Sequence, residues 1–156
     1  MSTYSNEAIK KFSLHYNCAQ AVFSTYAPLL GVDEKTALKL SCGFGGGMGR
    51  MQEVCGAATG AYMLIGGKYG MTDCADQPSK FHTYDVMREF TRKFLEKNGA
   101  LHCRDLLGCE MTTEEGMEYI RINKKFETTC RQCIECASNF VEEKLFHDEL
   151  IKITIE

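Results

Sequence analysis

One glycine-rich segment constrains the fold more than any other feature of this chain. Residues 43–50 read Gly-Phe-Gly-Gly-Gly-Met-Gly-Arg, and glycine weakens a helix because it loses the most conformational freedom on folding. The flanking sequence is rich in Ala, Leu, Met, Glu and Lys, which lose little freedom in a helix. Only two prolines occur, Pro28 and Pro78, and both fall where helical periodicity ends. The pattern predicts an all-α chain in which residues 43–50 form a shaped loop.

Capping residues and apolar spacing predict where the helices lie. The expected helical segments are 5–15 (capped by Ser5 or Asn6), 17–30 (capped by Asn17 and ended by Gly31), 33–40 (capped by Asp33), 52–68, 80–97 (ended by Asn98 and Gly99), a short turn at 103–108, a small helix from Thr112 or Thr113, and 128–150. Along residues 80–97 the side chains expected to face inward are Phe81, Tyr84, Val86, Met87, Phe90, Phe94 and Leu95. Residues 151–155 alternate in polarity over too short a stretch to form a sheet alone, so we expect a terminal extension.

The helix over residues 52–68 is predicted to lie at the centre of a bundle. Its small residues recur four apart, Gly56 with Gly60 and Ala57 with Ala61. Residues with that spacing share one face of a helix, and small side chains there let a second helix approach closely. The same face would suit either a homodimer or the interior of one bundle, and we favour the interior.

Length and composition favour one ordinary domain. The chain has 156 residues, 44% hydrophobic and 25% charged, with a net charge of -3 and no linker-like stretch. We therefore expect residues 1–156 to form a single compact, cysteine-rich helical domain, with 151–156 as its extension. No basic face suggests nucleic-acid binding. The first residues lack a secretory pattern, and the weakly polar run over residues 54–67 is too short to span a bilayer, so a cytoplasmic protein without membrane insertion is expected.

Nine cysteines must then be explained. They are Cys18, Cys42, Cys55, Cys74, Cys103, Cys109, Cys130, Cys133 and Cys136. An odd number cannot all pair within one chain, and a cell interior keeps ordinary thiols reduced. This cysteine content favours metal ligation or redox chemistry over structural cross-links.

Four of the cysteines stand in settings that favour a thiolate. Cys18 follows the expected cap Asn17, Cys55 falls in the first turn of the helix after the glycine-rich loop, and Cys130 follows two threonines. Free backbone N–H groups and the helix dipole lower a thiol pKa at such places. Cys103 precedes Arg104, whose charge would act in the same direction. Any one of these cysteines alone would as readily be a small buried hydrophobe, but four in comparable settings indicate function.

The glycine-rich loop differs from a phosphate-binding loop. It lacks a Gly-Lys-Ser/Thr ending and follows a helix rather than a strand. Successive glycine N–H groups can still form a concave anion site, here within one turn of Cys55, that holds a thiolate, a sulfide or a small anion. A tight connection between two helices would need glycine as well. The candidate cofactor-binding residues are Gly45, Gly46, Gly47, Gly49 and Gly56.

The spacing of Cys130, Cys133 and Cys136 opens a ferredoxin-like run but does not complete it. Phe140 stands where the fourth cysteine would fall, and on a helix the three sulfurs would spread over roughly 120°. A zinc site would need a second close pair, and Cys103 with Cys109 is too widely spaced. The four histidines are scattered along the chain.

Four motifs in order nevertheless resemble a known family. They are Asn17-Cys18-Ala19-Gln20-Ala21-Val22, the loop of residues 43–50 leading into Cys55-Gly56-Ala57-Ala58-Thr59-Gly60, Cys103-Arg104-Asp105-Leu106-Leu107-Gly108, and a cysteine in the last helix. Together they are similar to the C_GCAxxG_C_C family of redox-active proteins, over about residues 8–145. The resemblance implies a small, mostly prokaryotic helical protein, often associated with oxidoreductases or transporters. It places the four family cysteines on Cys18, Cys55, Cys103 and Cys130, with Cys133 as the competing choice for the last.

Three functions remain open from the sequence. The preferred one is electron transfer or thiol–disulfide chemistry at Cys18, Cys55, Cys103 and Cys130, which either ligate an iron–sulfur cluster or form switchable disulfides. It needs a redox partner protein, such as an oxidoreductase or a transporter component. The second is binding or delivery of zinc or copper(I), which soft thiolates favour. The third is a helical scaffold whose cysteines only pack. No hydrolase motif is found, and enzymatic activity is neither indicated nor excluded.

Overall fold

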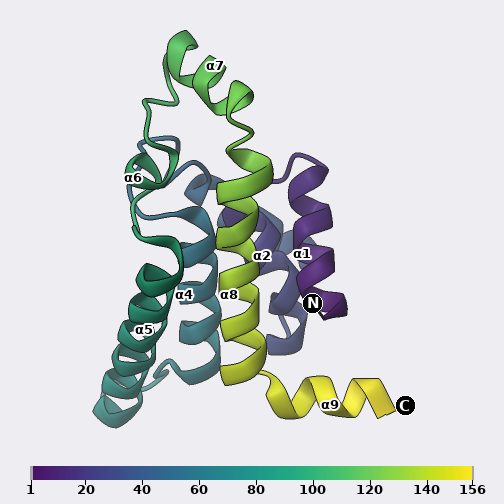
Figure 1. Ribbon diagram of the computed structural model, residues 1–156. Coiled ribbons are helices and arrows are strands. Elements are labelled where there is room, and N and C mark those ends of the chain that lie inside the picture. Colours follow the sequence, from purple (N-terminus) through teal and green to yellow (C-terminus); the bar gives the residue numbers. More distant parts are fainter. Residues whose placement is uncertain (1, 156) are drawn as a thin grey trace.

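The computed structural model describes residues 2–155, with side chains described for residues 2–152, and it confirms an all-α fold (Figure 1). The elements are α1 (Thr3–Ser13), α2 (Cys18–Tyr26), η1 (Ala27–Leu30), α3 (Glu34–Ser41), η2 (Cys42–Phe44), α4 (Gly56–Tyr69), α5 (Gln77–Asn98), α6 (Cys103–Leu107), α7 (Glu114–Ile122), the π-helical turn η3 (Phe126–Cys130), α8 (Arg131–Lys144) and α9 (His147–Ile155). Extended pairing within residues 2–155 is limited to one isolated antiparallel bridge, Val54 with His102. None of the described helices is both long enough and apolar enough to span a bilayer.

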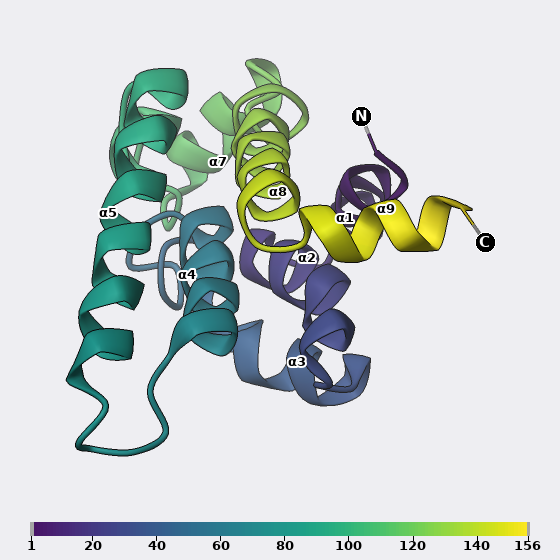
Figure 2. The ribbon, with the colours of Figure 1, turned by 90° about the horizontal axis from the view of Figure 1, so that it is seen from below.

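The helices pack into one compact bundle, with short helices at one end and α9 at the other (Figure 1). Helices α1, α2, α4, α5 and α8 lie side by side, while α6 and α7 lie at the end where α8 begins (Figures 1 and 2). Helix α9 leaves the bundle sideways at the opposite end (Figure 1). The bundle therefore has one end covered by short helices and irregular chain.

Three of the predicted N-terminal helix caps are confirmed, and the first is wrong. Asn17 Oδ1 accepts the N–H of Gln20, while the Gln20 side chain accepts the N–H of Asn17, which makes a capping box. Asp33 caps α3 by accepting the N–H of Thr36, and Thr113 caps α7 by accepting the N–H of Gly116. The first helix begins earlier than predicted, because its cap is Ser2 rather than Ser5 or Asn6. The side chain of Ser2 accepts the N–H of Ser5. The side chain of Ser5 is instead buried.

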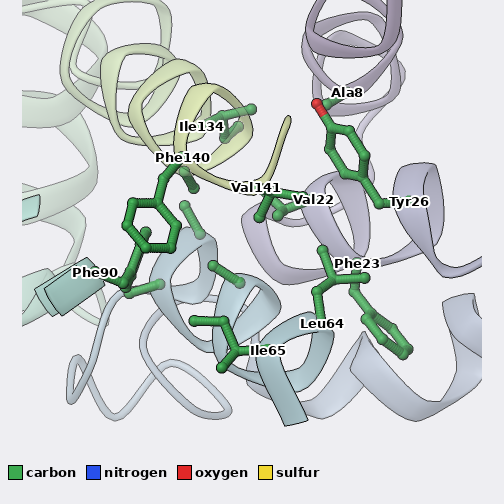
Figure 3. Close-up of a cluster of buried hydrophobic side chains, with 14 of the residues drawn as sticks. Ala8, Val22, Phe23, Tyr26, Leu64, Ile65, Phe90, Ile134, Phe140 and Val141 are labelled. Atoms are coloured by element: carbon green, nitrogen blue, oxygen red, sulfur yellow. The ribbon is translucent and has the colours of Figure 1, made fainter. Parts of the chain in front are cut away.

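Helix α4 forms the centre of the bundle, as predicted. Residues 56–61 are all buried, and a Cβ placed on Gly56 or Gly60 would lie 3.0–3.1 Å from atoms of α2. Leu64 and Ile65 follow on the same helix and are fully buried among side chains from neighbouring helices (Figure 3). The small-residue face is thus used inside the chain to pack α4 against α2.

Helix α5 buries a narrower face than the sequence suggested. Val86, Phe90 and Phe94 are buried, whereas Phe81, Tyr84 and Leu95 are 57%, 43% and 41% exposed. The prediction failed for these three because α5 is an outer helix of the bundle (Figure 2), so only one narrow stripe of it faces the core.

Three predicted boundaries near functional segments are also corrected. The central helix begins at Gly56 rather than residue 52, because residues 53–55 are drawn into the bridge with residues 101–103. The last predicted helix is divided into η3, α8 and α9. Residues 151–155, expected to be an extension, lie within α9, and residue 156 is outside the described part.

The glycine-rich loop folds into a left-handed turn. Five consecutive residues, 46–50, have φ between +63° and +69°, and Gln52 follows with φ +58°. Three of these six positions, Met48, Arg50 and Gln52, carry side chains, which makes the conformation costly. The Gln52 side chain offsets part of the cost: it is 2% exposed, accepts the N–H of Met111 at 2.9 Å and donates to the carbonyl of Cys109 at 2.9 Å. This turn is held rigidly against the segment that follows α6.

Candidate functional site

A cavity of about 790 Å³ lies between the left-handed turn, α1, α6 and the beginning of α8. Its walls include all four predicted cysteines and two others: Cys18, Cys42, Cys55, Cys103, Cys130 and Cys133. They also include all five predicted glycines: Gly45, Gly46, Gly47, Gly49 and Gly56. Aromatic and apolar side chains from α1 and η3, among them Phe12 and Phe126, form the rest of the lining together with Arg50. Segments distant in sequence thus bring six thiols to one space.

The first two cysteines meet where α2 and α4 pack most closely. Cys18 is the first residue of α2, and Cys55 immediately precedes α4. A Cβ on Gly56 would lie 3.1 Å from the Cβ of Cys18, a distance tighter than normal packing allows. Glycine at position 56 is therefore what lets the Cys18 side chain lie beside the start of α4.

The isolated bridge joins Cys55 to Cys103. The N–H of Cys55 donates to the carbonyl of Leu101 at 2.9 Å, and the N–H of Cys103 donates to the carbonyl of Glu53 at 2.7 Å. Both cysteines follow a bridge residue directly. Because side chains alternate along extended chain, the two cysteines lie on the same side of the bridge, the side that faces the cavity.

The left-handed turn closes over Cys103. At Gly47, where φ is +69°, an added Cβ would lie 2.7 Å from the Cβ of Cys103 and 2.7 Å from the carbonyl oxygen of Glu53. Glycine at position 47 therefore permits both the positive φ and the close approach of the turn to Cys103. The loop acts as a wall of the cavity that fits against one of its thiols.

Cys133 belongs to the cavity, although its role was left in doubt from the sequence. It lies in the first turn of α8, is 1% exposed and interacts with Cys55. Cys130 precedes it in η3 and interacts instead with Cys18. The sequence does carry a signal that Cys133 faces the bundle interior. It lies beside Ile134 and Ala137, two apolar residues that are fully buried on α8.

Cys55 is the thiol whose environment favours the anion. Hydrogen bonding with the Cys133 thiol lowers the pKa of Cys55, and the backbone N–H groups of Ala57 and Ala58 lower it further, while burial opposes them. The two backbone groups belong to the first turn of α4, where N–H groups lack helical partners. The direction of this shift agrees with the thiolate setting expected for Cys55.

Two of the other thiols shift in the opposite direction, contrary to the prediction. Interaction with Cys130, then burial, raises the pKa of Cys18 well above its ordinary value, even though a helix begins there. Burial and the nearby Cys55 raise the pKa of Cys103 to about 12. Arg104 does not counteract this, since its guanidinium lies 3.3 Å from Glu110. Negative charges close together repel each other, so ionisation of one thiol disfavours ionisation of its neighbours. Cys55 is therefore the preferred thiolate of the cluster.

Three backbone N–H groups of the turn belong to residues that line the cavity. Those of Gly46, Gly47 and Gly49 have no acceptor among the described residues, whereas the N–H of Met48 donates to the carbonyl of Phe44. Unpaired donors beside a cluster of thiols are suited to a thiolate or another small anion. The predicted anion-binding role of these glycines stays a prediction.

Metal ligation has less geometric support than thiol chemistry. Within the described residues, no group of three or more His, Cys, Asp or Glu side chains is arranged to hold a metal ion. The cysteines are all free thiols, and sulfur is a suitable donor for an iron–sulfur cluster, zinc or copper(I). The donor chemistry therefore fits these groups, but the arrangement does not form a ready ligand set. Ligation by Cys18, Cys55, Cys103 and Cys130 stays a prediction.

The remaining three cysteines do not line this cavity. Cys74 is exposed in the connection between α4 and α5. The Cys109 thiol donates to the carbonyl of Gly116 at 3.5 Å. Cys136, one turn after Cys133 on α8, lines a second and smaller cavity.

Fold and site together define a small all-helical protein with clustered thiols around a glycine-walled cavity. Residues 16–144 match the family described as "Putative redox-active protein (C_GCAxxG_C_C)", and the chain belongs to that family. Neither a curated protein nor a solved structure matches the chain significantly. The matched range contains all six cysteines and all five predicted glycines that line the cavity.

Proposed function

We propose that the protein carries out thiol–disulfide redox chemistry in the glycine-walled cavity, with Cys55 as the reactive thiol. The observation that carries the proposal is the gathering of free cysteines from α2, α6, η3, α8 and the start of α4 around one space. Because attack on a disulfide requires a thiolate, the lowered pKa of Cys55 favours it as the nucleophile. Membership in a family described as redox-active supports the same conclusion.

Cys133 is the natural second thiol. When the Cys55 thiolate attacks a disulfide, one S–S bond breaks, one thiol leaves and a mixed disulfide forms on Cys55. Cys133 then loses its proton and attacks the Cys55 sulfur, releasing the second thiol and leaving a Cys55–Cys133 disulfide. The substrate disulfide gains two electrons and two protons, and the two cysteines lose them. Cys133 already interacts with Cys55 before reaction.

Cys18 and Cys130 form a second interacting pair at the same cavity. Both are partly exposed, whereas Cys55 and Cys133 are buried. The outer pair is therefore suited to exchange electrons with a partner and pass them to the inner pair. The partner we propose is a protein that presents a disulfide or dithiol to the cavity mouth.

The test is a count of thiols and disulfides under anaerobic conditions, combined with peptide mapping. Protein oxidised with a disulfide reagent should gain a Cys55–Cys133 cross-link and lose it on reduction. Cys55→Ser should abolish that cross-link, while Cys74→Ser, in an exposed connection, should leave it unchanged. The proposal fails if oxidised and reduced protein show the same free-thiol count.

An iron, sulfide, zinc and copper assay on the same anaerobic sample decides between thiol chemistry and ligation. Specific evidence for a cluster would be stoichiometric iron and sulfide that Cys55→Ser removes. The unpaired N–H groups of Gly46, Gly47 and Gly49 would then serve as donors to cluster sulfur. Stoichiometric zinc or copper without iron would support metal binding or delivery instead.

A further inference from the structure

The second cavity lies between the outer helix α5 and α8. It has a volume of about 320 Å³ and is lined by residues from α5 and α8, including Phe90, Phe140, Lys97 and Cys136. This size is at the lower end of pockets that hold small molecules. Its only sulfur among the described residues is that of Cys136. Nothing in the thiol chemistry of the first cavity accounts for this pocket.

Cys133 and Cys136 connect the two cavities. Cys133 lines the first cavity and Cys136 lines the second. They are three residues apart on α8, so they face the same side of the helix, one turn from each other. One face of α8 thus carries a sulfur at each of the two cavities, Cys133 at the first and Cys136 at the second.

Asn98 contacts both of these sulfurs. The Cys133 Sγ lies 3.7 Å from Asn98 Oδ1, which can accept the Cys133 proton as an alternative to Cys55, and the Asn98 amide also interacts with Cys136. Gln132 Nε2 donates to the same Oδ1 at 3.2 Å, and Asn98 Nδ2 donates to the carbonyl of Phe94 at 3.0 Å. The amide is therefore fixed in place between α5 and α8. A fixed polar group shared by two thiols holds them near each other.

The surroundings also affect how readily Cys136 ionises. Burial raises the pKa of Cys136, and the Asn98 amide and the charge of Lys97 offset only part of that rise. Cys136 is partly exposed, unlike Cys133. A small disulfide that enters the second cavity therefore meets Cys136 before any other thiol.

We propose that Cys136 is a second entry thiol, which accepts a low-molecular-weight disulfide in the α5–α8 cavity and passes the oxidation through Cys133 to Cys55. The inference rests on the proposed thiol–disulfide function and adds a substrate class and a route to it. The protein then has two entrances, one for a partner at the first cavity and one for a small disulfide at the second.

The exchange balances in three steps. The Cys136 thiolate attacks R–S–S–R, the S–S bond breaks, and one R–S⁻ leaves and takes up the proton that Cys136 lost. The Cys133 thiolate attacks the Cys136 sulfur of the mixed disulfide, and the second R–S⁻ leaves and takes up the Cys133 proton. The Cys55 thiolate then attacks the Cys133 sulfur, and Cys136 is restored as a thiol with the Cys55 proton. In sum, one disulfide becomes two thiols, and Cys55 and Cys133 become a disulfide.

The second step requires a local adjustment of α8. Residues three apart on a regular helix have Cβ atoms about 5–6 Å apart, whereas a disulfide spans about 3.5–4.5 Å. The π-helical turn η3 ends at Cys130, directly before α8, so the hydrogen-bond register changes within one turn of Cys133. Such irregular turns are frequent at functional sites in helices.

The test uses 2-hydroxyethyl disulfide as the probe and the full-length chain. In Cys133→Ser the second step cannot occur, so a mixed disulfide with the probe should accumulate on Cys136, as peptide mapping would show. The double variant Cys133→Ser/Cys136→Ser is the matched control and should lack that adduct. Cys74, exposed in a loop, reports the general reactivity of the probe in every sample.

A second measurement follows the Cys55–Cys133 disulfide in protein that keeps both of those residues. With the probe as oxidant, Cys136→Ser and Cys136→Ala should both slow formation of this disulfide severalfold, and Cys74→Ser should not. The proposal is overturned if the disulfide forms equally fast without Cys136. If the wild-type protein never forms the disulfide with any oxidant, the proposed function fails as well, so the two failures are distinguishable.

Discussion

The two ends of the α4–α8 packing differ in the size of the side chains that fill them. Toward the middle of the bundle Leu64, Val22 and Val141 belong to one cluster of apolar side chains and are fully buried (Figure 3). At the start of both helices the corresponding positions carry Cys55 and Cys133, next to Gly56. Small side chains there leave the larger cavity. The same pair of helices thus provides a close-packed core at one place and a reactive space at another.

This difference indicates that stability and thiol reactivity depend on separate regions. A change in the close-packed part should lower the free energy of unfolding and leave the order of thiol reactivity unchanged. A change in the glycine wall should alter thiol reactivity as well.

The largest expected effect comes from the close-packed part. Leu64→Ala should lower the free energy of unfolding by about 2–5 kcal/mol because the side chain is fully buried and leaves a cavity. Urea unfolding measures the loss. Leu40→Ala is the matched control, since Leu40 is 59% exposed and should change stability by less than about 0.5 kcal/mol. The separation of regions would be wrong if Leu64→Ala changed which cysteine is alkylated first in the folded protein.

A smaller effect is expected in the glycine wall, where two neighbouring glycines allow a matched comparison. Alanine at a position with φ near +63° lowers the free energy of unfolding by about 1–2 kcal/mol. This is the whole effect expected for Gly49→Ala, because the added Cβ would have only one neighbour, the carbonyl oxygen of Gly43 at 3.8 Å. Gly47→Ala should cost more, because its Cβ would also collide with Cys103 and Glu53.

Urea unfolding and alkylation of Cys103 test this pair of variants together. Gly47→Ala should expose Cys103 to the alkylating reagent, and Gly49→Ala should do so less. Equal effects of the two variants on both measurements would show that the contact between the turn and Cys103 is unimportant.

The smallest effect is a loss of stability at alkaline pH. The pKa of Cys103 is raised from 9.0 to about 12 in the folded protein, so this thiol stabilises the fold fully below about pH 9 and loses that contribution as the pH rises toward 12. Cys18 and Cys133 are shifted in the same direction. Cys55 is shifted downward, so it favours folding above its ordinary pKa and partly offsets the loss.

Urea unfolding at about pH 8 and about pH 10 measures this loss. The contribution of Cys103 to the change in free energy of unfolding should stay near or below about 1 kcal/mol because the group is partly solvated. Cys103→Ser should show a weaker dependence on pH over that range. A wild-type protein that is equally stable at both pH values, or more stable at the higher one, would contradict the raised pKa of the clustered thiols.

Residue types alone were sufficient to predict much of the fold. Asn17 and Asp33 cap helices as expected because capping depends on local hydrogen bonds. The small face of α4 was recognisable because close helix packing requires glycine or alanine at fixed spacing. Boundaries failed where tertiary contacts decide: residues 53–55 look helical in isolation but pair with residues 101–103.

The site was less predictable than the fold. The four motif cysteines could be named from their settings, and the structure places all four on one cavity, but their pKa shifts depend on which thiols become neighbours. The left-handed turn could not be foreseen at Met48, Arg50 and Gln52, because a positive φ there is stabilised by distant partners such as Met111. Cys133 was missed as a partner of Cys55 because that contact exists only when α4 and α8 pack.

The bridge between Val54 and His102 has a consequence for the order of folding. Its two strands of backbone are separated in sequence by the whole of α4 and α5. Such a distant contact carries a loop-closure cost that local helix formation does not. We therefore expect the hairpin of α4 and α5 to form first and the bridge to bring Cys55 and Cys103 together afterwards. A newly made chain would then be able to carry out thiol chemistry only at the last stage of its folding.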